Sequence, residues 1–122
     1  MPGKESFRTV FEQLKKILQK YEARLIVTQN RPVGYSLNTP FSEKYKKEVF
    51  FGAVQIKKNY VSFYLMPVYI CPDLLDGISD GLRKRMQGKS CFNFKSAEPA
   101  LFDELAWLTR KSVDRLKREK LI

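Results

Sequence analysis

Apolar and polar side chains alternate over residues 49–67, and this alternation predicts a β-hairpin. If the chain reverses at Lys58-Asn59, the two arms pair without a slip. The apolar side then carries the pairs Gly52–Leu65, Val54–Phe63 and Ile56–Val61, and the opposite side carries Ala53–Tyr64, Gln55–Ser62 and Lys57–Tyr60. Successive side chains of a strand point to opposite faces, so a slip of one residue would mix the two sets. The sequence therefore predicts one core face and one face available for contact.

The rest of the chain predicts two long amphipathic helices and several short elements. Apolar residues recur every three or four positions in residues 6–21, with Ser6 as N-cap, and again in a final helix that starts near Pro99. The predicted short elements are strands at 25–28, 33–37 and 91–94, a turn at 30–32, a charged loop at 42–48, a helical turn at 73–75 and a short helix from Ser79 or Asp80 to Arg85 that Gly88 ends.

The order of these elements predicts a single α+β domain over residues 1–122. Strands joined by short turns pair in antiparallel fashion. The apolar stripes of the two long helices must be buried against the apolar face of the sheet. We therefore expect a two-layer sandwich, an antiparallel sheet with the N- and C-terminal helices packed on one face and the other face largely open.

The polar face of the predicted hairpin is the candidate binding surface. It combines flat apolar area with amide and hydroxyl groups, which suits a small organic ligand or a protein partner. The candidate binding residues are Phe51, Gln55, Tyr60, Ser62 and Tyr64. An alternative is that loops and the short helices of residues 74–86 cover this face, which would make Phe51 and Tyr64 part of a second core. The open-face interpretation predicts a non-enzymatic binding module.

An excess of positive charge indicates anionic partners. The chain has 23 Lys and Arg against 13 Asp and Glu, a net charge of +10. Such an excess favours polyanions, and it also keeps a small protein soluble. If the basic clusters meet beside Tyr60 and Tyr64, they form an anion-binding rim, and cations interleaved with aromatic rings are typical of proteins that bind single-stranded nucleic acid. The predicted rim residues are Lys57, Lys58, Arg83, Lys84, Arg85 and Lys89.

The residue types argue against an enzyme, a metal site or a nucleotide loop. Histidine, the side chain most used for acid-base catalysis near neutral pH and the commonest metal ligand, is absent. Cys71 and Cys91 stand among apolar residues without metal-ligand spacing, and we expect buried free thiols. Gly88-Lys89-Ser90 lacks the first glycine of a phosphate loop and follows a predicted helix instead of a strand. We predict no catalytic residue, no metal and no cofactor.

The N-terminus does not resemble a signal peptide, and no apolar run approaches the ~20 residues of a membrane helix. We expect a cytoplasmic protein with no membrane partner, present as a monomer or a homodimer.

Two stretches resemble the YdhG-like family of small bacterial domains of unknown function. They are residues 51–69, FGAVQIKKNYVSFYLMPVY, and residues 82–95, LRKRMQGKSCFNFK. The resemblance implies a frataxin-like α-β-α layout and, by analogy with frataxin, a role as an iron chaperone with carboxylates on the first helix. The charged residues in and beside that helix are Glu5, Glu12 and Glu22 against Lys4, Arg8, Lys15, Lys16, Lys20 and Arg24. An excess of cations repels iron ions.

Overall fold

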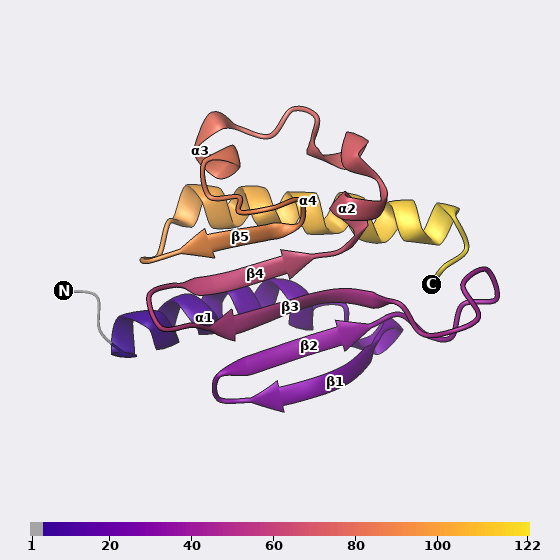
Figure 1. The fold of residues 1–122 in the computed structure, drawn as a ribbon, viewed down its shortest axis with the longest axis horizontal. Coiled ribbons are helices and arrows are strands. Elements are labelled where there is room, and N and C mark those ends of the chain that lie inside the picture. Colours follow the sequence, from indigo (N-terminus) through magenta and orange to yellow (C-terminus); the bar gives the residue numbers. More distant parts are fainter. Residues whose placement is uncertain (1–3) are drawn as a thin grey trace.

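The computed structural model describes residues 4–122, with side chains from Phe7 onward. The elements in chain order are α1 (Lys4–Gln19), η1 (Glu22–Arg24), β1 (Ile26–Arg31), β2 (Gly34–Asn38), β3 (Phe50–Ile56), β4 (Val61–Leu65), α2 (Pro67–Ile70), η2 (Pro72–Leu75), α3 (Asp80–Arg83), β5 (Cys91–Phe94) and α4 (Pro99–Arg118). The two long helices are thus the first and last elements, and the strands lie between them (Figure 1).

The strands form one antiparallel sheet in which neighbours in sequence are neighbours in space, in the order β1-β2-β3-β4-β5 (Figure 1). β3 and β4 pair in the predicted register, with Val54 opposite Phe63. The Lys57 N–H donates to the Tyr60 carbonyl oxygen at 2.8 Å, and this bond closes the turn at Lys58-Asn59. The hairpin prediction is therefore confirmed pair by pair.

Both long helices pack on one face of the sheet (Figure 1). α1 contacts β3, β4 and α4. The Phe94 ring of β5 meets the Phe102 ring of α4 edge to face, with centroids 4.9 Å apart, and this contact joins α4 to the same layer. The largest fully buried side chains are those of Phe11, Tyr35, Phe51, Phe63, Phe92 and Phe94. The structure confirms the predicted α+β class with terminal helices on the sheet.

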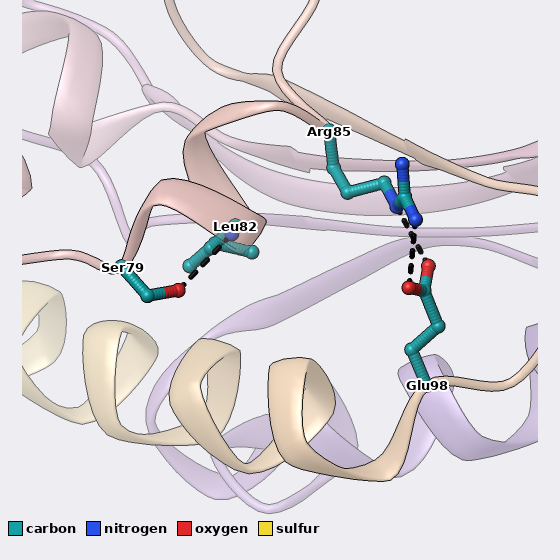
Figure 2. A network of polar contacts seen from close by, with 4 residues as sticks. All are labelled: Ser79, Leu82, Arg85 and Glu98. Atoms are coloured by element: carbon teal, nitrogen blue, oxygen red, sulfur yellow. Dashed lines mark hydrogen bonds and ion pairs between the residues drawn. The ribbon is translucent and has the colours of Figure 1, made fainter.

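We call the sheet face that points away from α1 and α4 the outer face. The connection from β4 to β5 contains α2, η2 and α3, and all three contact α4. Figure 1 shows this connection at the β5 edge of the sheet. The Ser79 hydroxyl oxygen accepts a hydrogen bond from the Leu82 N–H at 3.1 Å and so caps α3, as predicted (Figure 2). The helices of residues 4–122 therefore leave the outer face of β2, β3 and β4 uncovered.

Several boundaries differ from those predicted. α1 already includes Ser6, so Ser6 is not its N-cap. β1 extends to Arg31, and the turn falls at Pro32-Val33, where the Val33 side chain is 49% exposed instead of lying in a strand. The predicted strand over 60–67 ends at Leu65, and α2 begins at Pro67. Proline suits the first turn of a helix because its missing N–H would have no intrahelical partner there.

Candidate ligand-binding site on the outer sheet face

Two rows of side chains cross the outer face at right angles to the strands. One row is Gln55–Ser62–Asn93, and the next is Ala53–Tyr64–Cys91. Ser62 and Ala53 are small and lie between larger neighbours, and only 1% and 3% of their surfaces are exposed. They form the floor of the outer face, while Gln55, Tyr64 and Asn93 are partly exposed around them.

The Asn93 amide is held by three hydrogen bonds. Its Oδ1 accepts from the Ser62 hydroxyl at 2.7 Å and from the Cys91 thiol at 3.3 Å. Its Nδ2 donates to Gln87 Oε1 at 2.7 Å. Burial raises the pKa of the Cys91 thiol, so this group stays protonated at neutral pH and acts as a donor. The network fixes the orientation of Asn93 and brings Gln87 to the outer face.

Residues 85–87 pair with the edge of β5 that β4 does not use. The Asn93 N–H donates to the Arg85 carbonyl oxygen at 2.8 Å, and the Gln87 N–H donates to the Cys91 carbonyl oxygen at 2.9 Å. The chain reverses at Gly88, whose φ of 83° lies in the left-handed region that glycine adopts without strain. The pairing places the side chains of this segment beside those of β5.

A pocket of about 360 Å³ lies between this segment and the turn end of β4. Its lining residues are Tyr60, Lys84, Arg85, Met86, Gln87, Asn93, Lys95, Ser96 and Glu98. The set combines one aromatic ring, two amides, a hydroxyl and several charged groups. The volume lies within the range of small-molecule pockets, and the lining is more polar than is usual for them.

The charges around the pocket are mostly positive. Arg85 and Glu98 form a two-pronged ion pair, with Nε and Nη2 of Arg85 donating to the carboxylate at 2.7 and 2.8 Å (Figure 2). This hydrogen bonding raises the pKa of Arg85 above its ordinary value. Lys84 and Lys95 are exposed cations on the same lining. With Arg85 and Glu98 offsetting each other, the lining has a net charge of about +2, which favours an anionic group in the ligand.

Phe51 does not belong to the outer face, contrary to the sequence prediction. Its side chain is 0% exposed and is part of the hydrophobic core. The register between β2 and β3 shifts here, because Leu37 lies opposite Gly52 whereas Asn38 lies opposite Phe50. A bulge of this kind interrupts the strict alternation of side chains, which the sequence prediction had assumed. Phe51 is therefore unavailable to a ligand unless the core opens.

The other four candidate residues do lie on the outer face. Gln55, Tyr60 and Tyr64 are partly exposed there. Tyr60 is the one of them that lines the pocket. Ser62 is buried in the floor, so its role is to hold Asn93 and not to contact a ligand directly.

Only some of the residues predicted to form the basic rim lie at or beside the pocket. Lys84 and Arg85 line the pocket, and Lys57 and Lys58 lie at the adjoining turn. Arg83 instead donates to the Leu75 carbonyl oxygen at 3.2 Å, in the connection beside α4. The Lys89 ammonium lies 5.9 Å from the centre of the Tyr69 ring of α2. These last two cations do not line the pocket.

The sequence prediction missed several lining residues: Gln87, Asn93, Lys95, Ser96 and Glu98. The strand at 91–94 had been predicted, and the alternation of its side chains would have identified Asn93 as an outward-facing residue. Because Phe92 and Phe94 face the core, Asn93 must face outward beside Ser62. Gln87 and Glu98 lie in irregular segments, where spacing along the chain gives no direction for a side chain.

Among the side chains that the structure describes, from Phe7 onward, no three of His, Cys, Asp or Glu lie close enough together to hold a metal ion. None of the described helices is both long enough and apolar enough to cross a bilayer.

Comparisons with protein-family models, with curated proteins and with solved structures found no match to this chain. The resemblance to the YdhG-like family therefore remains a prediction.

Proposed function

We propose that the chain is a non-enzymatic binding module that holds a small organic ligand with an anionic group in the pocket on its outer face. The observation that supports this best is the meeting of Tyr60, the Asn93–Gln87 amide pair and two lysines around one cavity of about 360 Å³. Three chain segments contribute to it: the β3–β4 turn, residues 84–87, and β5 with the stretch that follows it.

The lining suits a ligand with a flat polar part and a charged end. A tyrosine ring offers a stacking surface, and amides offer both donors and acceptors. Lys84 and Lys95 are suited to a phosphate or carboxylate. A protein partner would have to cover a pocket lining that is mostly polar and charged, whereas a partner interface usually centres on desolvated aromatic or aliphatic anchors. A small anionic ligand is thus the better fit.

The Arg85–Glu98 ion pair provides the first test. Replacing Glu98 by glutamine removes the carboxylate that forms the ion pair with the Arg85 guanidinium. We expect the affinity for uridine monophosphate to rise about threefold to tenfold in Glu98→Gln, because a charged donor becomes available to the phosphate. Lys95→Gln is expected to lower the affinity by a similar factor. Isothermal titration calorimetry of the full chain measures both.

Glu119→Gln is the matched control, since it removes the same charge from the exposed end of α4. It is expected to leave the affinity within about twofold of the parent, because solvent and salt screen distant surface charges. Equal gains in the Glu98 and Glu119 variants would show that only the net charge matters and would overturn the proposed site. So would the absence of any heat with uridine monophosphate, ribose 5-phosphate and inorganic phosphate.

A further inference from the structure

We infer that the ligand class is single-stranded nucleic acid, with one nucleotide in the pocket and the strand continuing along β4 toward Tyr64. The inference rests on the proposed function and adds to it that the ligand is a strand of several nucleotides that runs along β4. It follows from three features of the outer face: the spacing of two aromatic rings, the amides between them and the cations at one end.

Tyr60 lies just before β4 and Tyr64 lies within it, four residues apart, and both side chains are on the outer face. Two residues of a strand advance about 6.6 Å, so these positions are about 13 Å apart. Both side chains are partly exposed. At this separation each ring would stack on a different base, and stacking on aromatic side chains is the sequence-tolerant way in which proteins hold single strands.

Amide side chains lie between the two rings. Gln55 and Asn93 flank the buried Ser62 in the row that separates Tyr60 from Tyr64. The Gln55 amide makes no hydrogen bond within the described part of the chain, although it is partly buried. Gln55 therefore offers both donors and an acceptor to the edge of an unpaired base, while Asn93, whose Oδ1 already accepts two hydrogen bonds, offers one remaining Nδ2–H. In a duplex the base edges are already paired, so a duplex could not form hydrogen bonds with the amides of this row.

The cations lie at the pocket end of this path, at the opposite end from Tyr64. Lys57 and Lys58 lie at the turn next to Tyr60, and Lys84 and Lys95 line the pocket. The one carboxylate among the lining residues, that of Glu98, is already bonded to Arg85. The arrangement is complementary to a polyanion, and the net charge of +10 acts in the same direction.

Fluorescence anisotropy with labelled oligouridylates of two, four and eight nucleotides tests the inference on the full chain, with unlabelled uridine monophosphate as competitor. We expect the affinity to rise at least tenfold from the monophosphate to the tetramer and then to level off. It should fall about tenfold between 50 and 200 mM salt. Tyr60→Ala and Tyr64→Ala should each weaken tetramer binding by about fivefold to a hundredfold, while Tyr64→Phe keeps it.

Tyr45→Ala is the control variant, because Tyr45 is an exposed tyrosine beside a lysine, in the loop between β2 and β3. It should leave binding unchanged. Circular dichroism establishes that each variant is folded before binding is compared. Tetramer binding no tighter than that of the monophosphate would overturn this inference and leave the proposed function intact. Equal binding of single strand, duplex and heparin would overturn it too, and the loss of all binding, monophosphate included, would overturn both.

Discussion

Phe63→Ala is expected to lower the free energy of unfolding by about 3–5 kcal/mol. Phe63 is 0% exposed in the middle of β4, opposite Val54 on one side and Phe92 on the other. Removing its ring leaves a cavity beneath α1 that the surrounding core can fill only in part. Urea denaturation followed by circular dichroism measures the change.

The adjacent residue is the internal control. Tyr64 points to the outer face, where the ring keeps part of its contact with water, so Tyr64→Ala should cost only about 1 kcal/mol. The contrast tests which face of β4 is buried. Equal losses from the two substitutions, or a larger loss from Tyr64→Ala, would mean that the outer face is a second core.

Gly52→Ala is expected to destabilise the protein by about 1–3 kcal/mol. A methyl group at Gly52 would lie 2.8 Å from the Tyr64 carbonyl oxygen and 3.3 Å from Leu18 Cδ2. The first neighbour is backbone in the paired strand, so the strands themselves would have to shift. The midpoint of urea denaturation reports the change.

Gly81→Ala is the matched substitution. A methyl group there would meet only the end of the Leu101 side chain, at 3.3 Å, and Ser79 Oγ, at 3.8 Å. Because alanine is favoured over glycine within a helix, we expect α3 to tolerate the change with no loss or a small gain. If Gly52→Ala proved as harmless as Gly81→Ala, the close approach of the Tyr64 carbonyl oxygen and the Leu18 side chain to Gly52 would be contradicted.

The hairpin was predictable because its information is local. Alternation over residues 49–67 fixes which side chains share a face, and two turn residues fix the register, so every pair from Gly52–Leu65 to Ile56–Val61 was assigned correctly. The bulge at Phe51 was not predictable in this way. It depends on how β2 pairs with β3 across the loop at 39–49, and no periodic signal in β3 marks it.

The candidate site was predictable only in part. Gln55, Tyr60 and Tyr64 follow from the hairpin, whereas the pocket requires the pairing of β5 with residues 85–87. That segment is too short to show a period. The Arg85–Glu98 pair joins it to the start of α4, and nothing in the spacing of these two residues indicates that they meet.

The implied iron role gains no support from the described side chains. The frataxin-type site would need carboxylates gathered on α1, and the described part of that helix carries Glu12 among Arg8, Lys15 and Lys16. The charge there repels a ferrous or ferric ion. The anionic ligand proposed above is consistent with the sign of this surface.

The most direct test of the outer face as a binding surface is an amide chemical-shift titration of the isotope-labelled full chain with uridine monophosphate. We expect the backbone resonances of Tyr60, Gln87, Asn93 and Lys95 to move together with a single dissociation constant, while those of Leu14 in the buried stripe of α1 stay in place. Shifts confined to α1 and α4, or no shift up to millimolar ligand, would contradict the proposed site.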